Sequence, residues 1–355
     1  MCFHLGVLRF LAECGQLERV DRVSTVSGGS LLLGLMLREA DLRWPSSTEL
    51  LEAVYPRLRE KLCARSLQWG ALRELARPWN WRFILSRSNL LALALQREWS
   101  VSARLADLPA HPEWSINGTT AETGKRFRFK RDSLGDWVIG YAAPGNFPLA
   151  AALAVSAAFP GGFGPLTFDA TRFAWKRRPW GVPLESARPI DPDFKRLHLY
   201  DGGVYDNLGL EPFFDSGTGT TKRTGDAILV SDAGAPFAPG FGTAALNPWR
   251  LKRVADIMSE QSRALRVRAF TAFVQRDAAH GAYLYIGLPA PAGGSVQAAT
   301  LAARHPTTLV RPTKAQFDAI VQHGYQLAAD SSAQLGLRLM LDSSTTATQR
   351  EVLHG

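Results

Sequence analysis

The chain has 355 residues, of which 46% are hydrophobic and 21% charged, an ordinary composition for a globular protein. No fixed-period repeat or low-complexity tract is present, and the longest apolar stretch, 147–159, is too short to span a bilayer. The formal charge of +9 and the pI of about 9.7 favour anionic partners, among them phospholipid surfaces, nucleic acid and acidic proteins.

The cysteines and the N-terminal residues indicate where in the cell the protein is located. Cys2, Cys14 and Cys63 are an odd, scattered set, which predicts neither a disulfide framework nor a metal cluster. The N-terminus lacks the basic segment of a secretory signal, and Arg9 and Glu13 interrupt the apolar residues that follow. We therefore expect a protein of the cytoplasm or of the membrane periphery, with no cofactor and no metal.

The first elements indicate the fold class. Apolar residues at helical spacing predict a helix over 3–14, and a run rich in Val, Ser and Thr predicts a strand over 21–26. A second helix is predicted over 31–39. The order of helix, strand, glycine turn and helix predicts an α/β fold with parallel strands.

The rest of the chain is predicted to continue the same domain. We expect a catalytic domain over 1–235, an extension packed on it over 236–342, and a loose tail over 343–355. The further predicted elements are a mainly helical insertion at 46–108, strands within 113–142, a helix over 149–159 ended by Pro160, strands at 197–200 and 227–231, a flexible loop within 235–248, and helices at 249–275 and 314–330.

The segment 24–30 reads Ser-Thr-Val-Ser-Gly-Gly-Ser and resembles a nucleophile elbow. Gly28 and Gly29 allow a tight turn beside Ser27 and place its hydroxyl at a helix N-terminus. Exposed N–H groups there favour negative charge, which suits an activated serine and a developing oxyanion. The match to G-x-S-x-G is partial, because Thr25 replaces the first glycine. A turn that only caps a helix is the alternative.

The second candidate is Asp201, at the end of a short predicted strand. Gly202 and Gly203 follow it and can aim the carboxylate into a site. Taken alone, this segment also fits an Asp-Gly turn whose carboxylate faces solvent.

Together these segments resemble the patatin-like phospholipase family over roughly residues 3–235. The family order is kept by several further stretches. They are Phe3-His4-Leu5-Gly6-Val7-Leu8, Asn117-Gly118-Thr119-Thr120 with Thr123-Gly124, Ser156-Ala157-Ala158-Phe159-Pro160 with Phe163-Gly164-Pro165, and Ser231-Asp232-Ala233-Gly234.

The resemblance implies a three-layer α/β sandwich with a central, mostly parallel sheet and a helical insertion. It also implies a serine hydrolase of lipid acyl esters, of the phospholipase A or esterase type. Ser27 would be the nucleophile and Asp201 the general base, in a dyad without histidine. The other implied site residues are the elbow and oxyanion glycines Gly28 and Gly29 and the turn glycines Gly202 and Gly203.

One departure from the family concerns the oxyanion hole. In the family, a strand and a G-G-G-x-R-like loop precede the helix that begins here at Cys2 or Phe3, and this sequence has neither. A start codon assigned too late and a real truncation both fit. Since losing one oxyanion donor typically lowers turnover about 10²–10³-fold, we expect the 355-residue chain to be weakly active or unstable.

The insertion combines positive charge with tryptophan. Between Arg57 and Trp99, nine basic and three acidic residues give a net charge of +6. Basic and aromatic side chains together suit contact with anionic headgroups, and the insertion is predicted to be a lid over the acyl pocket. An ordinary helical insertion with buried tryptophans is the alternative. The tryptophans are Trp69, Trp79, Trp81 and Trp99.

Two other functions compete with this interpretation. A Ser-His-Asp α/β-hydrolase would need a histidine after the serine, and His280, His305 and His323 are the candidates. A non-catalytic membrane-binding protein that kept the fold is the second. Nucleic-acid binding is not expected, because no recognised module is apparent. The lipid head group, acyl length, sn position, pathway and oligomeric state do not follow from the sequence.

Overall fold

The computed structural model describes residues 1–84, 86–159, 164–179, 186–225, 227–237, 239–241, 249–277 and 280–334. Several sequence predictions fall wholly or partly outside these residues, namely the helix stop at Pro160, the family segment that includes Phe163, most of the loop within 235–248, parts of the extension over 236–342, and the tail over 343–355. No helix in the described ranges is both long enough and apolar enough to cross a membrane.

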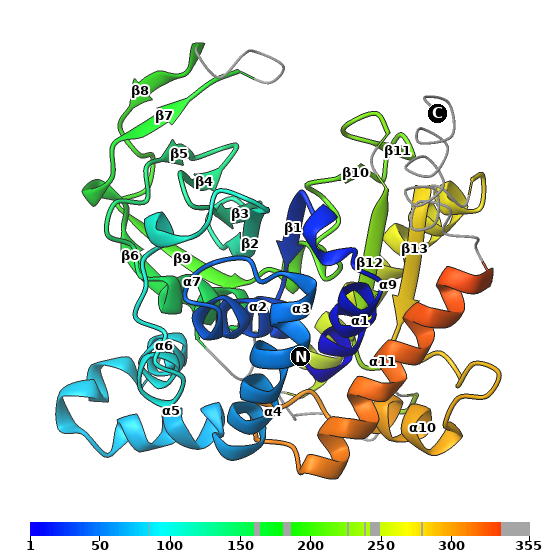
Figure 1. Ribbon diagram of the computed structural model, residues 1–355. Coiled ribbons are helices and arrows are strands. Elements are labelled where there is room, and N and C mark those ends of the chain that lie inside the picture. The colour runs from blue at the N-terminus through cyan, green and yellow to red at the C-terminus, as the bar shows by residue number, and fades with distance from the viewer. Residues whose placement is uncertain are drawn as a thin grey trace, which may run out of the picture.

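A large, mainly antiparallel sheet organises one half of the molecule (Figure 1). In the described residues its strands pair in the order β6-β9-β2-β3-β4-β5-β7-β8, and β1 pairs with β2. The strands are β1 Arg22–Thr25, β2 Glu113–Thr120, β3 Arg126–Phe129, β4 Leu134–Asp136, β5 Gly140–Ala142, β6 Leu166–Asp169, β7 Trp175–Arg177, β8 Arg188–Ile190 and β9 Arg196–Asp201.

The expected mostly parallel sheet is therefore wrong for this part of the chain. Only β1 and β2 run parallel in the main sheet, and its other pairings are antiparallel. The physical reason is the short connections from β2 to β5, because neighbouring parallel strands need a crossover of a dozen or more residues. The helix, strand and helix at the N-terminus predicted the parallel pairing of β1 correctly, but that pattern does not extend to the rest of the sheet.

Two smaller sheets complete the strands of the described residues. The pair β12 (Ile228–Asp232) and β13 (Gly281–Tyr285) is parallel, and helix α9 (Trp249–Val274) forms the crossover between them. Figure 1 shows both strands beyond β1, on the side away from β2. The antiparallel pair is β10 Phe214–Asp215 with β11 Thr220–Thr221.

Helices cover these sheets, and the predicted helical segments are present. The segment 46–108 is mainly helical, as predicted. The helix predicted over 149–159 ends earlier, at Ser156. The helices besides α9 are α1 Cys2–Glu13, α2 Gly28–Glu39, α3 Ser47–Glu49, α4 Tyr55–Ala64, α5 Leu67–Leu75, α6 Arg87–Glu98, α7 Leu149–Ser156, α8 Gly203–Asp206, α10 Val296–Arg304 and α11 Lys314–Gln334, with a π-turn at Leu50–Val54 and 3₁₀ turns at Leu17–Arg19, Pro78–Phe83, Leu105–Asp107 and Ala170–Arg172.

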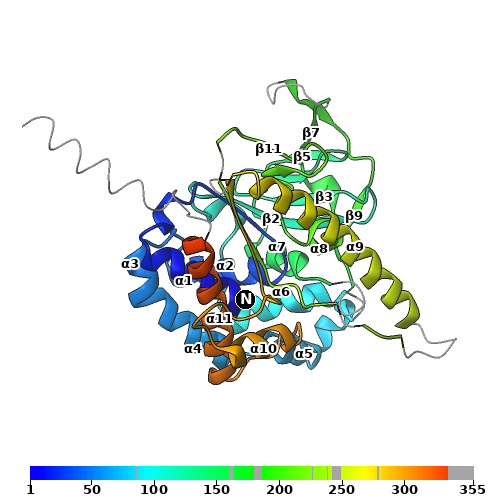
Figure 2. The same ribbon diagram turned by 90° about the vertical axis from the view of Figure 1, so that its right-hand side faces the viewer.

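Helices from the two ends of the described chain pack against each other. A Cβ atom on Gly6 of α1 would lie 2.0 Å from the carbonyl oxygen of Val321, and one on Gly324 of α11 would lie 2.2 Å from that of Phe3. Only glycine permits this backbone contact. In Figures 1 and 2, α1 and α11 lie side by side.

The core beneath the elbow is formed by α2 and α7. Helix α7 reads Leu-Ala-Ala-Ala-Leu-Ala-Val-Ser, and all of its residues except Ala151 are buried. A helix that is apolar on all sides belongs in the interior of a protein. It packs against β2 and β9 on one side and against α2 and α6 on the others, so its C-terminal end reaches the end of β1 and the end of β9.

Candidate active site

Ser27 lies at a sharp turn between β1 and α2. Its backbone has φ 50° and ψ −122°, a conformation that side-chain-bearing residues rarely adopt. Residues held in such regions are typical of active sites, where surrounding contacts maintain the strain. The strain therefore resides on Ser27 itself. An added Cβ on Gly29 would meet only ordinary contacts, the nearest at 3.8 Å, so this glycine is not required by a steric clash.

Hydrogen bonds from α7 hold the elbow. The Ser27 N–H donates to the Ser156 carbonyl oxygen at 3.0 Å and lies 3.2 Å from the Ser156 hydroxyl oxygen. The Gly29 N–H donates to the Val26 carbonyl oxygen at 3.0 Å. Gly28 is the first residue of α2, so its N–H has no acceptor within the helix. Of these three donors, the Gly28 N–H is the one available to an oxyanion.

Asp201 ends β9 beside this turn and is 2% exposed. It pairs with Gly118 across the sheet, and its carbonyl oxygen accepts a 2.9 Å bond from the Thr119 hydroxyl. Its carboxylate accepts a hydrogen bond from the Gly203 N–H at 2.7 Å, and the Ser27 side chain lies close enough to lower its pKa. The fold thus brings together the two residues that the sequence singled out.

Close packing explains the two glycines after Asp201. A Cβ on Gly202 would lie 2.5 Å from the carbonyl oxygen of Asn117, and a Cβ on Gly203 would lie 2.7 Å from Oδ1 of Asn207. Side chains at these positions would push the turn away from β2. The D-G-G sequence therefore lets the strand end lie close enough to the sheet for Asp201 to face Ser27.

The surroundings of Asp201 change its acidity. Burial raises its pKa to about 7, while the hydrogen bonds from Gly203 and Ser27 oppose that shift by stabilising the ionised form. A carboxylate with a pKa near neutrality can accept a proton at physiological pH and return it. General bases require this property.

Ser27 and Asp201 open into a cavity of about 1560 Å³. This volume exceeds the roughly 300–1,000 Å³ of typical small-molecule sites. Most of the lining is apolar, and α1, β1, α2, β12 and β13 all contribute to it. Its apolar residues include Val23, Leu31, Leu208 and Leu284. The cavity can take a long apolar ligand with its reactive group at Ser27.

Helix α9 braces this region through two buried ion pairs. Arg263 donates to Asp232 at the end of β12, with 2.8 Å from Nε, and Tyr283 donates to the same carboxylate at 2.7 Å. Arg266 lies 3.6 Å from buried Asp206 of α8, the helix that follows Asp201. Sequence reasoning placed Asp232 in a family motif but missed its partners, Arg263 on α9 and Tyr283 on β13, which lie 31 and 51 positions later.

Other residues near the elbow were also missed. The Ser30 and Ser156 hydroxyls, both fully buried, lie 2.8 Å apart beneath Ser27. His4 Nδ1 lies 2.8 Å from the Ser231 hydroxyl, and burial lowers the His4 pKa to about 3, which keeps the ring neutral. The sequence offered these residues only as parts of motifs, because their contacts join segments far apart in the chain.

The histidines proposed for a triad have other contacts. His280 stacks on the Phe273 ring, with centroids 4.0 Å apart, and bonds the Phe273 carbonyl oxygen. His323 is buried and bonds the Ile286 carbonyl oxygen at 3.1 Å. His305 follows α10 at the edge of the cavity. The carboxyl group of Asp201 is instead the group that lies beside Ser27.

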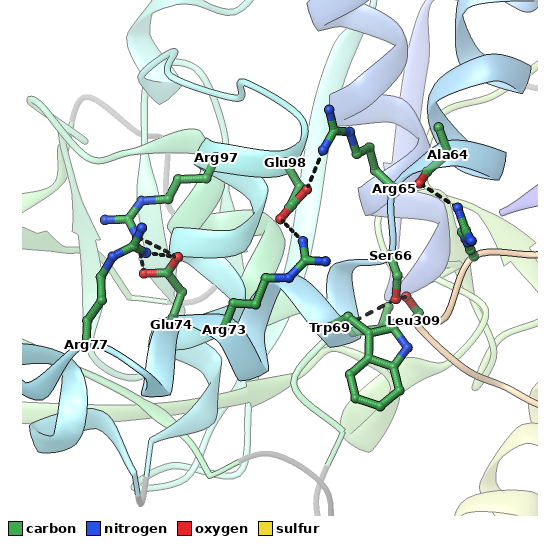
Figure 3. A network of polar contacts seen from close by, with 11 residues as sticks. Ala64, Arg65, Ser66, Trp69, Arg73, Glu74, Arg77, Arg97, Glu98 and Leu309 are labelled. Atoms are coloured by element: carbon green, nitrogen blue, oxygen red, sulfur yellow. Dashed lines mark hydrogen bonds and ion pairs between the residues drawn. The ribbon is translucent and has the colours of Figure 1, made fainter.

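The basic insertion is internally paired, as Figure 3 shows. Buried Glu74 bonds Arg77 and Arg97, and Glu98 pairs with Arg65 and Arg73 at 3.5 and 3.2 Å. Glu74 and Glu98 are already counted in the net charge of +6, so only acidic residues outside the insertion compensate it further. Arg59 pairs with Asp318 and Lys61 with Glu39.

Several large apolar side chains of the insertion are exposed, three of its tryptophans among them. Trp69, Trp79 and Trp81 are 57%, 65% and 60% exposed, and Ile84 is 54% exposed. The Trp81 indole N–H donates to the Leu75 carbonyl oxygen, which holds the ring in its outward position. The alternative of an insertion with buried tryptophans thus fails for these three and holds for Trp99, which is 1% exposed.

Comparison with known proteins identifies the family. A family model described as patatin-like phospholipase matches residues 1–214, which is more than half of the chain. The chain belongs to the patatin-like phospholipase family. This membership agrees with the resemblance drawn from the motifs. The activity that the family suggests is that of a lipid hydrolase. No curated protein matches the sequence.

Two solved structures are similar to the chain. One is human GIVD cytosolic phospholipase A2 in complex with methyl gamma-linolenyl fluorophosphonate, at 14% identity and a TM-score of 0.49, with 98% of this chain and 57% of that chain covered. The other is the same human enzyme with this inhibitor and terbium chloride, at 14% identity and a TM-score of 0.48, with 96% and 57% covered. The chain therefore spans less than two thirds of either one.

Proposed function

We propose that this patatin-like protein is a lipid acyl hydrolase of the phospholipase A or esterase type, with Ser27 and Asp201 as its catalytic dyad. The observation that supports it best is that the strained Ser27 and the buried Asp201 lie beside each other at the wall of a large apolar cavity. Family membership supports the lipid substrate.

The proposed reaction proceeds through an acyl-enzyme. The Asp201 carboxylate takes the hydroxyl proton as Ser27 Oγ attacks the ester carbonyl carbon. When the C–O bond to the alcohol breaks, Asp201 returns this proton to the leaving oxygen. Water then attacks the acyl-serine and gives its proton to Asp201, and Ser27 Oγ takes the proton back as it departs. The products are a fatty acid and an alcohol, and the enzyme regains its starting state.

The Gly28 N–H is the proposed oxyanion donor of the elbow. It lies at the N-terminus of α2, where the helix dipole also favours the negative charge of the tetrahedral intermediate. The Ser27 and Gly29 N–H groups are already bonded to Ser156 and Val26, which supports assigning this role to Gly28 alone among the three.

We further propose that the insertion contacts a membrane surface. Its exposed tryptophans suit the headgroup region, where amphipathic rings partition favourably. Its ion-paired arginines would add only a modest attraction to anionic lipid. This contact would place the cavity, which α5 helps to line, beside the lipid substrate. We propose likewise that the protein is located at the membrane periphery. The same holds for the three-layer arrangement of the fold and for the domain bounds given above.

Covalent labelling tests the proposed function directly. A fluorophosphonate ester should phosphonylate Ser27, and the mass shift should map to the peptide that contains it. Hydrolysis of p-nitrophenyl esters by the purified protein should be lost in proportion to labelling. Labelling elsewhere with full activity would overturn Ser27 as the nucleophile, and equal loss of activity on replacing His280, His305 or His323 would favour the triad. No labelling and no turnover, together with vesicle binding, would favour the non-catalytic membrane protein.

A further inference from the structure

A chain of hydroxyl groups runs beneath the elbow. The Trp114 indole N–H donates to the Thr25 hydroxyl at 2.8 Å. The Thr25 and Ser30 hydroxyls lie 2.8 Å apart, and so do those of Ser30 and Ser156. The Ser156 hydroxyl oxygen lies 3.2 Å from the Ser27 N–H. Four short contacts thus connect a tryptophan on β2 to the backbone of the proposed nucleophile.

The chain has an unusual distribution of donors. Both ends, Trp114 and Ser27, are N–H groups, so each donates inward. Two hydrogen bonds join the three hydroxyl groups that lie between these ends, and each bond needs one donated proton. The hydroxyls can therefore satisfy both contacts in more than one arrangement. Ser30 and Ser156 are fully buried, so water does not replace a missing partner.

Thr25 is the residue at which the elbow departs from the G-x-S-x-G pattern. A glycine there would provide no hydroxyl and would leave the Trp114 N–H and the Ser30 hydroxyl without this partner. The backbone of Thr25 is held separately, because its carbonyl oxygen accepts a 2.9 Å bond from the Asn117 amide. The side chain is thus available for the hydroxyl chain while the strand end stays in place.

We propose that Thr25 is a positioning residue for Ser27, acting through Ser30 and Ser156 on the Ser27 backbone. The inference rests on the proposed function for its catalytic consequence, but not for its structural one. By fixing the Ser27 N–H, the chain maintains the strained turn and sets the direction of the next N–H, that of Gly28. A displaced turn would misalign the attacking oxygen and the oxyanion donor together, and small misplacements of this kind can lower turnover about 10²-fold.

Substitutions at Thr25 separate its hydroxyl from its shape. Thr25→Val keeps the shape and removes the hydroxyl, whereas Thr25→Ser keeps the hydroxyl. We expect Thr25→Val to lower kcat about 10- to 100-fold with little change in KM, and Thr25→Ser to retain most of the wild-type kcat. Ser30→Ala breaks the chain at the next link without exposing the Trp114 N–H, and it should resemble Thr25→Val. If Thr25→Val does not fold, Ser30→Ala takes its place in the test.

The matched control is Thr120→Val. Thr120 is fully buried, and its hydroxyl donates to Asp136 at 2.8 Å, away from the dyad. This variant should lower the melting temperature about as much as Thr25→Val while keeping kcat. Equal loss of kcat in the control would overturn the proposal, since any buried hydroxyl would then have the same effect. Equal loss in Thr25→Val and Thr25→Ser would overturn it as well.

Amide exchange provides a readout that does not depend on catalysis. Hydrogen–deuterium exchange at the Ser27 amide should accelerate at least tenfold in Thr25→Val and Ser30→Ala, and should stay at the wild-type rate in Thr25→Ser and Thr120→Val. Unchanged exchange in Thr25→Val would refute the positioning role even if its activity fell. If the wild-type protein cleaves no ester, the proposed function fails, and the exchange rates still decide whether Thr25 holds Ser27.

Discussion

The carboxyl group of Asp201 lies close enough to Ser27 for the serine side chain to lower its pKa. Both residues are also fixed by the same segment behind them. The Ser27 N–H donates to the Ser156 carbonyl oxygen at 3.0 Å, and the Asp201 N–H donates to the Ala158 carbonyl oxygen at 3.1 Å. Because Ser156 and Ala158 are two positions apart, these two main-chain hydrogen bonds set the distance between Ser27 and Asp201. Side-chain substitutions in the pair should leave this backbone geometry intact.

The two residues are expected to act as one unit. Ser27→Ala and Asp201→Asn should each lower the rate of p-nitrophenyl ester hydrolysis about 10⁴-fold or more, and the double variant should lose little beyond either single one, because members of a catalytic unit are strongly non-additive. Steady-state rates of the three variants provide the measurement. Losses that multiply in the double variant would show that the residues act independently.

The rate of hydrolysis should depend on the ionisation of Asp201. Since burial raises its pKa to about 7, the ionised base should be a minor species well below neutrality. We expect kcat/KM to increase about tenfold per pH unit in the acidic range and to level off above about pH 7. A profile that is already flat between about pH 5 and 8 would contradict the assignment of Asp201 as the base.

The same shift should appear in stability. The pKa of Asp201 is higher in the folded protein than its ordinary value of 3.8, so the folded state binds more protons between about pH 4 and 7. The contribution of Asp201 to stability is therefore present below about pH 4 and is lost as the pH rises through about 7. Asp201→Asn should melt a few degrees above wild type at pH 8, and the difference should close near pH 4. Thermal unfolding at both pH values tests this, and a constant difference would count against it.

Gly202 should tolerate no side chain. Gly202→Ala places a Cβ atom 2.5 Å from the Asn117 carbonyl oxygen, so the turn that holds Asp201 must move. We expect a melting temperature lower by several degrees and a loss of kcat greater than about tenfold. Gly217→Ala is the control, because its nearest neighbour is the exposed Asp215 side chain at 3.2 Å. Similar losses in both variants would indicate a general sensitivity to glycine replacement.

Vesicle binding should depend on the exposed tryptophans of the insertion. The double substitution Trp79→Ala with Trp81→Ala should weaken binding to vesicles about tenfold or more, with esterase activity on a soluble substrate retained. Trp137→Ala is the control, since Trp137 is 53% exposed but lies outside the insertion. Co-sedimentation with neutral and anionic vesicles at two salt concentrations measures the effect. Strong salt dependence would show that charge, rather than the aromatic surface, dominates the contact.

Local patterns predicted the elements around the site well. Helix α1, strand β1 and the positions of Ser27 and Asp201 follow from short-range signals: helical periodicity, β-branched residues and glycine pairs. The strand order did not follow from such signals. The sequence pattern at β1 is typical of a parallel strand, and nothing local in residues 113–142 indicates that β2 pairs with β1 and also with β9.

The supporting contacts were harder to predict for the same reason. Ser30, Ser156 and Trp114 each have an ordinary role in their own element, and their joint role beneath Ser27 arises only when three segments meet. The ion pairs of the insertion were missed in the same way. A count of charges gives the net charge, but it does not show that Glu74 and Glu98 each pair with two arginines.

The contact between α1 and α11 has a consequence for biosynthesis. The backbone at Gly6 meets α11, which the ribosome makes roughly three hundred residues later. During translation the elements around Ser27 are complete early, but α1 lacks the helix that covers it. Its apolar face would stay open to water or to a chaperone until the last helix emerges. The assembly of a finished cavity is thereby tied to completion of the described chain, and a ribosome stalled before residue 314 would carry the dyad without a closed pocket around it.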